Sequence, residues 1–434
     1  MKTVAIITEF NPFHKGHEYI IKKAKEVTGA TCCIIITSGN YVQRGEPSFI
    51  DKYTKTEVAL NHGADIVFEL PVFFSTASAR YFSMAAVGLL DKLQVVDYLA
   101  FGVESNSLEN LSTIVQELTN ENDEYKEYLR ESQKCGNSFP TSRRDAILKM
   151  YGEDTAALLD TPNNILAIEY MRALALRSSN IKPIGIKRIK AAYHEDFNEI
   201  KNITDSNYIC SEDSPRLYSA SNLRKLSDDS LGDILSLIDN VYAWNYKKTY
   251  PVGITSDFSA ITGLKLYDAI ANNTLSDIFD LTLDIANKFA NNFSKYTNFS
   301  SFITLNKSKD VSYTSLSRAL LHIALDIKTS HVNDLINQDY GNFIRLLGFN
   351  NIGKSILPEI KSKSSMTVIS NMAAFIKDLD SIKKDSIEKD SINKNSSDWI
   401  RHCIRCDDLY RLITISKHRV DIPNEFTKKF IKCD

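Results

Sequence analysis

The stretch Val4-Ala5-Ile6-Ile7-Thr8, followed after a short loop by His14-Lys15-Gly16-His17, decides the fold. The first run is apolar and rich in β-branched residues, which is typical of a buried strand. Apolar positions then recur at helical spacing, at Ile20, Ile21, Ala24 and Val27. We therefore predict a strand, a loop and a helix that begins at the HxGH tetrapeptide.

The alternation of strand and helix continues outward from this unit as far as Val103. The predicted strands are Cys32 to Thr37, Ala64 to Leu70 and Val95 to Val103, the predicted helices are Asp51 to His62 and Ala77 to Leu90, and Ile184 to Ile189 could return to the sheet. Strands separated by helices indicate right-handed βαβ units and a parallel, Rossmann-like α/β sheet. In such a sheet ligands bind beyond the carboxyl ends of the strands, which is where the HxGH residues fall.

The HxGH tetrapeptide suits phosphate chemistry. A helix N-terminus offers free N–H groups and the positive end of the helix dipole. Gly16 lets a phosphate or an adenine approach the backbone closely, and the imidazoles of His14 and His17 can donate hydrogen bonds to phosphate oxygens as charge develops. The alternative is a chance tetrapeptide with surface histidines and a turn glycine.

A second candidate element is Ser219-Ala220-Ser221-Asn222-Leu223-Arg224, at a predicted helix start far downstream. Hydroxyls, backbone N–H groups and a cation together hold phosphates well, so Ser219, Ser221 and Arg224 could bind the β- and γ-phosphates of a nucleotide. The alternative is a serine N-cap beside a solvated arginine.

The rest of the chain is predicted to be mostly helical. Thr161-Pro162 is typical of an N-cap and first helical position. We expect a catalytic α/β domain over residues 1–225 and a helix-rich domain over residues 226–434. Asp-Ser-Ile occurs three times at a five-residue interval from Asp380, which matches neither a helical nor a strand period. We interpret residues 380–397 as a low-complexity surface insertion.

Composition narrows the class of protein. The formal net charge of −2 does not indicate a basic nucleic-acid-binding chain, although a local basic patch would be enough. No apolar run approaches the roughly 18 residues of a membrane span, and no signal peptide pattern is present. Dispersed cysteines indicate reduced thiols in the cytoplasm. Cys403 and Cys406 form a lone CxxC without the further ligands of a zinc site, so no metal site is predicted.

Several motifs together carry a resemblance to a known family. They are Glu9 to His17, Gly63-Ala64-Asp65-Ile66-Val67-Phe68-Glu69-Leu70-Pro71, Phe101-Gly102-Val103-Glu104, Pro162 to Tyr170, Arg188, His194, Ser219-Ala220-Ser221 and Tyr340 to Lys354. With these residues the chain resembles the bacterial tRNA(Met) cytidine acetate ligases of the HxGH nucleotidyltransferase superfamily. The resemblance implies the HUP/nucleotidyltransferase sheet with a mostly helical C-terminal domain.

The resemblance also implies a reaction and its residues. Acetate and ATP would give acetyl-adenylate and pyrophosphate, and the acetyl group would pass to N4 of the wobble cytidine of elongator tRNA(Met). The implied catalytic residues are His14, His17, Ser221 and Arg224. The implied ATP contacts are Ile7, Thr8, Glu9, Phe10, Asn11, Pro12, Phe13, Lys15, Gly16, Glu18, Tyr19, Ile20, Gly102, Asn163, Asn164 and Arg188. Mg²⁺ is expected with the phosphates, and Glu69 and Glu104 could bind it or pair with nearby lysines instead.

The tRNA surface is expected in the helical domain. Arg318, Arg345, Lys354 and the C-terminal stretch are the candidate cations, with Arg345 and Lys354 flanking a predicted turn at Gly348-Phe349. Two other functions stay open: a small-molecule adenylyltransferase, and a non-catalytic RNA-binding protein with a relic nucleotide fold.

Overall fold

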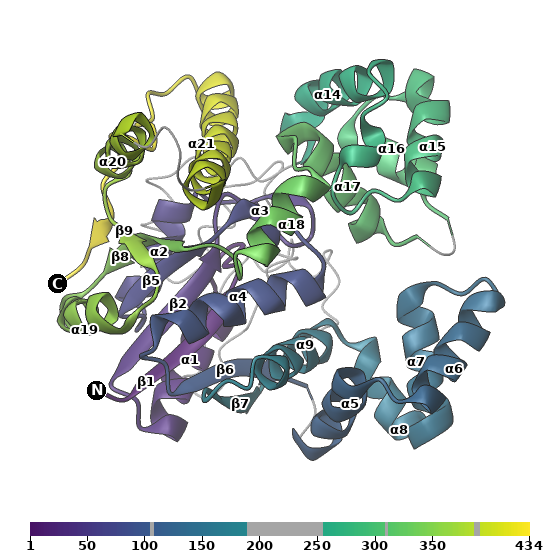
Figure 1. Cartoon of the computed structure of the whole chain (residues 1–434), viewed down its shortest axis with the longest axis horizontal. Coiled ribbons are helices and arrows are strands. Elements are labelled where there is room, and N and C mark those ends of the chain that lie inside the picture. The colour runs from purple at the N-terminus through teal and green to yellow at the C-terminus, as the bar shows by residue number, and fades with distance from the viewer. Residues whose placement is uncertain (105–107, 189–254, 309–310, 386–390) are drawn as a thin grey trace, which may run out of the picture.

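The chain is built on one mostly parallel sheet with helices on both faces (Figure 1). The structure, a computed structural model, describes residues 1–104, 108–188, 255–308, 311–385 and 391–434. The strand order is β10-β8-β5-β2-β1-β6-β7, and β9 pairs with β8 at the side. Their bounds are β1 Thr3–Thr8, β2 Cys32–Ser38, β5 Ile66–Leu70, β6 Tyr98–Val103, β7 Lys182–Lys187, β8 Phe343–Phe349, β9 Thr367–Ile369 and β10 Ile431–Lys432.

The sheet reverses its direction of growth at β1. From β1 the chain moves to β2 and β5 on one side, and it later places β6 and β7 on the other, all five strands being parallel. Ile6 pairs with Ala100, so Thr8 and Gly102 reach the carboxyl edge together. A crevice forms at such a reversal point, where α/β proteins bind their ligands. This arrangement confirms the predicted Rossmann-like sheet and the predicted edge for the HxGH residues.

Two groups of helices cover the sheet. Buried residues of α1 (Lys15–Thr28) and α2 (Lys52–Asn61) pack with Val4 and Ile6 of β1 on one face. Those of α4 (Ala79–Leu93) and α9 (Pro162–Leu176) pack with Ala5 and Ile7 on the other. The alternation follows from the two-residue period of a strand, which turns successive side chains to opposite faces.

Two helical extensions project from this core. One contains α5 (Leu108–Asn120), α6 (Asp123–Lys134), α7 (Phe139–Tyr151) and α8 (Glu153–Ala156). The other contains α14 (Ser259–Ala271), α15 (Leu283–Asn292), α16 (Phe299–Asn306), α17 (Tyr313–Leu325) and α18 (Thr329–Asn337). They lie on the same side of the sheet in Figure 1, with the short α3 (Val72–Ser75) between the sheet and the second extension. Within the described ranges, no helix is both long enough and apolar enough to cross a membrane.

The C-terminal part of the chain returns to the sheet. After β8 come α19 (Asn351–Lys363), β9, α20 (Met372–Asp385), α21 (Ser391–His418) and β10. The strand β8 runs antiparallel to β5, and Gly348 and Phe349 belong to it rather than to the predicted turn. A side chain at Gly348 would crowd the carbonyl oxygen of Ile431 at 2.9 Å, which explains the glycine.

The Asp-Ser-Ile repeat overlaps the ends of two helices, although its five-residue period is not a helical one. Its first residues end α20 and its last residues begin α21, with residues 386–390 outside the described ranges. Helical spacing of apolar residues in the flanking segments, such as Ile376 and Leu379 before it and Ile400 and Ile404 after it, outweighs the local repeat because these residues are buried.

Candidate active site

The HxGH residues form a capping box at the N-terminus of α1. His14 is the N-cap: its Nδ1 accepts a hydrogen bond from the N–H of Gly16 at 3.1 Å. In return, Nδ1 of His17 accepts from the N–H of His14 at 3.2 Å. The two rings stack with their centroids 3.9 Å apart. A β-carbon at Gly16 would lie 2.9 Å from Cε1 of His14, so the stacked ring requires glycine there.

Both histidines are held neutral. Burial, and then the neighbouring Arg188 cation, lower the pKa of His14 to about 4. Burial, then His14 and Arg188, lower the pKa of His17 well below its usual value. Since Nδ1 is the acceptor in each ring, the single ring proton of each belongs on Nε2. The pair therefore offers two fixed N–H donors, which is the arrangement that stabilises negative charge on a phosphate.

The rings of two buried phenylalanines pack against the ring of His17. The ring centroids of Phe10 and Phe13 lie 5.0 and 5.5 Å from that of His17, and both side chains are fully buried. Phe10 adopts a φ of 47°, a left-handed conformation that costs free energy for a residue other than glycine. Complete burial of its ring holds it there. Because these side chains belong to the core, we expect Phe10 and Phe13 to meet a ligand through their backbone.

The carboxyl ends of β6 and β7 bring the next predicted residues to the same edge. A β-carbon at Gly102 would lie 3.2 Å from Cγ of Arg188 and 3.9 Å from Cδ1 of Ile20. The backbone N–H of Arg188 donates to the carbonyl of Val103 at 3.0 Å. Gly102 therefore makes room for the arginine stem, and Arg188 comes near enough to influence both histidines.

Glu104 connects the two asparagines to Arg188. Its backbone N–H donates to Oδ1 of the buried Asn164 at 3.1 Å, and its Oε1 accepts from Nδ2 of Asn163 at 2.7 Å. The same Oε1 lies 3.8 Å from Nη1 of Arg188. The residues predicted at the end of β6, at the start of α9 and after β7 thus form one network. Glu104 itself was predicted to bind Mg²⁺ or to pair with a lysine, and its partners here are Asn163 and Arg188 instead.

The remaining predicted contacts surround this network. Ile7 and Thr8 are buried at the end of β1, and Oγ1 of Thr8 has no hydrogen-bond partner among the described residues. Lys15, Glu18, Tyr19 and Ile20 are half-buried on the first turns of α1. Ser221 and Arg224, like Ser219 and His194, lie outside the described residues. A buried hydroxyl without a partner is costly, so Oγ1 of Thr8 supports the interpretation that a polar ligand binds here.

Sequence reasoning missed the buried Lys55 of α2. Its ammonium donates to the carbonyls of Glu9 at 3.0 Å and Gly39 at 2.7 Å, and to Oγ of Ser48 at 3.2 Å. These bonds tie the loop after β1 to the loop after β2. Asn11 adds a further tie, since its Oδ1 accepts from the N–H of Phe49 at 2.7 Å. No sequence pattern predicts these contacts, because they join loops that only the sheet brings together.

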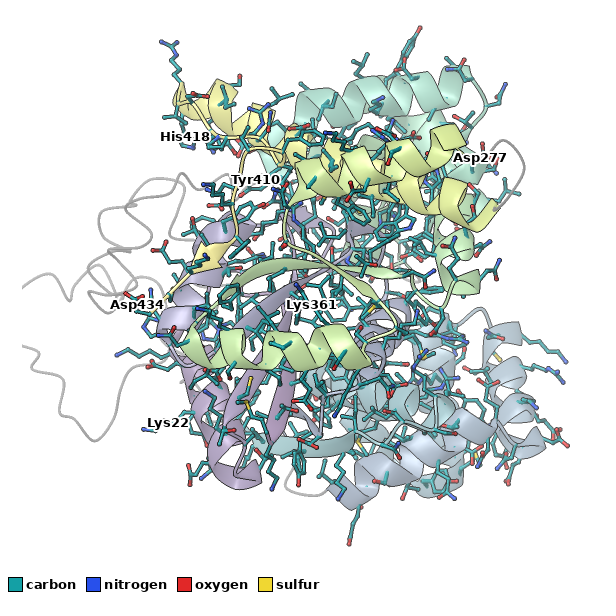
Figure 2. The ribbon with its side chains drawn as sticks, turned by 60° about the vertical axis from the view of Figure 1, so that its left-hand side comes forward. Lys22, Asp277, Lys361, Tyr410, His418 and Asp434 are labelled. Atoms are coloured by element: carbon teal, nitrogen blue, oxygen red, sulfur yellow. The ribbon has the colours of Figure 1, made fainter. Side chains whose placement is uncertain are left out.

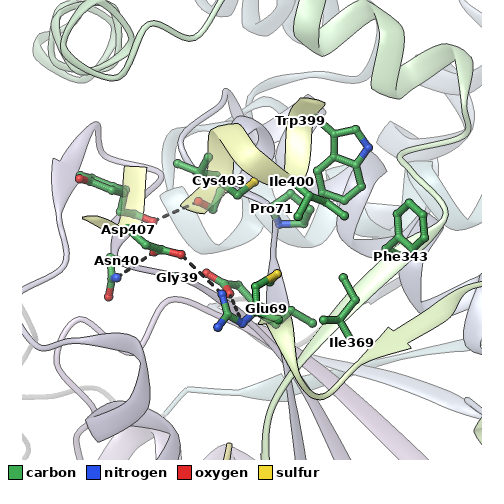
Figure 3. A pocket seen from close by; sticks show the side chains of 15 residues that line it. Gly39, Asn40, Glu69, Pro71, Phe343, Ile369, Trp399, Ile400, Cys403 and Asp407 are labelled. Carbon is green, nitrogen blue, oxygen red and sulfur yellow. Dashed lines mark hydrogen bonds and ion pairs between the residues drawn. The ribbon is translucent and has the colours of Figure 1, made fainter. Parts of the chain in front are cut away.

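The structure contradicts the predicted role of Arg345 in RNA binding. Arg345 lies in a buried ionic cluster with Lys52, Glu69, Asp407 and Glu425. Glu69 and Asp407 of this cluster line a cavity of about 40 Å³ under α21 (Figure 3). Nζ of Lys52 lies 3.0 Å from Glu69 and 2.5 Å from Asp407. The guanidinium of Arg345 contacts Glu425 directly. Its charge is already neutralised by carboxylates from distant parts of the chain.

Of the two other predicted RNA cations, one is paired with a carboxylate and the other lies at the opposite edge of the sheet from the histidines. Nε of Arg318 lies 2.9 Å from Oδ2 of Asp280, and its side chain is only 14% exposed. Lys354 lies in the first turn of α19, just after β8. The last residue of β8, Phe349, pairs with Ile66, the first residue of β5. Lys354 is therefore at the amino edge of the parallel strands, opposite the histidines. Neither the paired Arg318 nor the position of Lys354 supports the predicted tRNA surface, which stays a prediction.

The comparisons with known proteins agree with one another. A family model described as HIGH Nucleotidyl Transferase matches residues 1–421. A tRNA(Met) cytidine acetate ligase of Clostridium perfringens strain SM101 is 36% identical over 385 residues, covering 86% of this chain and 90% of the relative. Its counterpart in Caldanaerobacter subterraneus subsp. tengcongensis is 34% identical over 376 residues, with coverages of 86% and 90%. The crystal structure of Thermotoga maritima TmcAL bound with alpha-thio ATP superposes with a TM-score of 0.85 at 25% identity, over 100% of this chain and 99% of that one.

Proposed function

This chain belongs to the HIGH nucleotidyl transferase family and, within it, to the tRNA(Met) cytidine acetate ligases, and from that premise we propose how its site works. It is an ATP-dependent ligase that acetylates a cytidine of tRNA(Met). The finer assignments, namely the residues, N4 of the wobble cytidine and the elongator tRNA, are our proposal. The observation that carries the residue assignment is the stacked, neutral pair of His14 and His17 at the reversal point of the sheet.

In the first step an acetate oxygen attacks the α-phosphorus of ATP. A bond forms between that oxygen and phosphorus, the bond from phosphorus to the bridging β-phosphate oxygen breaks, and pyrophosphate leaves. The Nε2–H groups of His14 and His17 donate to the α-phosphate oxygens, whose charge they stabilise. Arg188 adds positive charge nearby. No protein nucleophile is needed, so catalysis rests on positioning and electrostatics.

The rest of the ATP site holds the nucleotide in place. Oγ1 of Thr8, without a partner among the described residues, is the proposed donor or acceptor for a polar group of ATP. Asn163 and Asn164 place side-chain amides beside Glu104 at the start of α9, where we expect the ribose. Ser221 and Arg224 remain the proposed ligands of the leaving pyrophosphate.

In the second step N4 of the cytidine attacks the acetyl carbonyl carbon. A carbon–nitrogen bond forms, the bond to the AMP oxygen breaks, AMP leaves and N4 loses a proton. The cytosine must leave its stack to reach a crevice at the edge of the sheet. We propose that the tRNA approaches this carboxyl edge, where both helical extensions also project.

Glu104 and Glu69, the two carboxylates predicted as possible Mg²⁺ ligands, do not form a metal site. Oε1 of Glu104 already accepts from Asn163 and faces Arg188, and Glu69 is bound by Lys52. Within the described ranges, no three histidine, cysteine, aspartate or glutamate side chains converge as metal ligands. We therefore derive no step through a metal ion. Mg²⁺ commonly binds through phosphate oxygens and water rather than a protein cage.

The proposal is tested by following both steps separately. The purified protein is incubated with ATP and labelled acetate, with or without elongator tRNA(Met), and acetyl-adenylate, pyrophosphate and N4-acetylcytidine are measured. We expect acetyl-adenylate without tRNA and N4-acetylcytidine only with it. Adenylate transfer to a small molecule without any need for acetate would indicate an adenylyltransferase instead. ATP binding without turnover would indicate a non-catalytic RNA-binding protein.

A further inference from the structure

A short hairpin lies between the ATP site and the second helical extension. Its strands are β3 (Tyr41–Val42) and β4 (Glu46–Pro47), which pair antiparallel, with Gln43, Arg44 and Gly45 at the tip. The N–H of Gly45 donates to the carbonyl of Val42 at 2.9 Å, and Gly45 has a φ of +77°, which favours glycine. We call residues 41–47 the tip hairpin.

The backbone of the tip hairpin is held on two sides. On the side of the ATP site, the N–H of Gln43 donates to Oε1 of Glu9 at 2.6 Å. On the other side, the carbonyl of Gly45 accepts from Oγ of Ser317 in α17 at 2.8 Å. A β-carbon at Gly45 would clash with the backbone nitrogen of Arg318, so the backbones of the hairpin and of α17 are in contact. The tip is therefore a fixed bridge from the loop after β1 to the helices beyond.

The base of the hairpin is fixed by α21. The hydroxyl of Tyr41 donates to the carbonyl of Cys406 at 2.8 Å, and that of Tyr410, labelled in Figure 2, donates to the carbonyl of Ser48 at 2.8 Å. Nδ2 of Asn40 donates to Asp407 at 2.9 Å. The position of the hairpin thus depends on three separate parts of the chain, and its backbone is well defined before any ligand arrives.

Arg44 is the one tip residue whose side chain is left exposed. It makes no hydrogen bond or ion pair with any residue in the described ranges, unlike Arg318 and Arg345. It follows Gln43, whose N–H is bound by the first loop residue of the ATP site. An exposed cation without a partner among the described residues therefore lies next to the residue that is bonded to the loop after β1, on a backbone that loses little freedom when a ligand binds.

From this geometry we propose that Arg44 binds a phosphate of the tRNA strand whose cytidine enters the adenylation site, an inference that rests on the proposed function. A cation exposed to solvent suits a polyanion that arrives from solvent. The proposed nucleotide contacts are the half-buried His14 and His17 and the neighbouring Arg188, whose guanidinium already faces Glu104 at 3.8 Å. Arg188 is also the cation that lowers the pKa of both histidines. Arg44 is thus a contact for the second substrate rather than for ATP.

The test compares Arg44→Ala and Arg44→Lys with Lys354→Ala, which removes an exposed cation at the opposite edge of the sheet. Acetate-dependent exchange of pyrophosphate into ATP, without tRNA, reports the first step. The Kd for elongator tRNA(Met) at several salt concentrations reports tRNA binding, and the KM for tRNA in the acetylation assay reports its use. Thermal unfolding shows whether each variant is folded.

We expect Arg44→Ala to leave exchange within about twofold of wild type and to raise the Kd and KM for tRNA roughly tenfold, as for a lost charged hydrogen bond. The slope of log Kd against log salt should fall by about 0.7 to 1, the value of one released counterion. Arg44→Lys should retain most of the affinity because it keeps the charge. Lys354→Ala should behave as wild type in every assay.

Two results would overturn the inference. Equal tRNA affinity and salt slope in Arg44→Ala and Lys354→Ala would show that no phosphate is bound at the tip. A raised KM for ATP in the exchange assay would assign Arg44 to the nucleotide. If wild type lacks acetate-dependent exchange, the proposed function fails instead, and the tRNA binding measurements still decide the role of Arg44.

Discussion

Replacing His17 by asparagine or by glutamine should separate its structural and its catalytic use. Nδ1 of His17 accepts the N–H of His14, while Nε2 carries the proton proposed to reach the α-phosphate. Asparagine can place an oxygen near the Nδ1 position but has no donor at Nε2. Glutamine can place an amide N–H near the Nε2 position but loses the cap acceptor. The two variants therefore remove opposite ends of the same ring.

The expected sizes of the two effects differ widely. Loss of one donor to a developing oxyanion costs about 10²–10³ in rate, or roughly 2.7–4 kcal/mol. Both variants lose the ring stack with His14, worth about 1 kcal/mol, and glutamine also loses a cap worth about 1 kcal/mol. The His17→Asn variant should thus have the lower exchange rate, and the His17→Gln variant should have the lower free energy of unfolding.

The assays are acetate-dependent pyrophosphate exchange at saturating ATP and urea unfolding of the free protein. We expect the exchange rate of the His17→Asn variant to fall at least a hundredfold, while its free energy of unfolding falls by only about 1 kcal/mol. His17→Ala should lose both properties. If the asparagine variant kept exchange close to wild type, the histidine would be structural and the proposed donor would be wrong.

Three further predictions follow from other contacts. Burial lowers the pKa of His14 to about 4, below its unfolded value of 6.5, so the unfolded chain binds more protons than the folded protein between these pH values. The free energy of unfolding should therefore fall as the pH drops from 6.5 to 4, and above pH 6.5 it should not depend on His14. Urea unfolding at a series of pH values measures this. Gly102→Ala should raise the KM for ATP roughly fivefold, because its β-carbon would press on the stem of Arg188 at 3.2 Å; an unchanged KM in the exchange assay would contradict this. Arg345→Ala should lower the free energy of unfolding by about 3–5 kcal/mol, because it leaves Glu425 and Asp407 buried with one cation fewer, whereas Lys354→Ala should change it by less than about 0.5 kcal/mol.

The parts of the fold that the sequence predicted are those set by local pattern. The runs Val4 to Thr8 and Cys32 to Thr37 are apolar and short, and they became β1 and β2 within one or two residues. The predicted helix Asp51 to His62 became α2, which begins one residue later because Asp51 caps it through two backbone N–H groups. The strand β8 could not be placed in this way, because its antiparallel pairing with β5 joins segments almost three hundred residues apart, for example Ile66 and Phe349.

The histidine loop was predicted because its residues are adjacent in the chain. The other half of the candidate site lies on β6, α9 and β7, and it was placed by resemblance. What joins the halves is a set of contacts without any sequence signature. Glu104 links Asn163 to Arg188, and Lys55 links the loops that follow β1 and β2. Each contact depends on which strand ends the sheet places side by side.

The predicted RNA surface shows why a cation cannot be assigned from sequence alone. Arg345 precedes Gly348-Phe349 by a few residues in the sequence, a combination that suits nucleic acid, yet its charge is neutralised by Glu69, Asp407 and Glu425 from distant segments. A charge that already has buried partners would lose them on binding a phosphate, so it gains little. The relevant property is an exposed cation without a partner near the chemistry. Of Arg44, Arg318, Arg345 and Lys354, Arg44 at the tip hairpin meets that condition, whereas Arg318 and Arg345 are paired and Lys354 lies at the opposite edge.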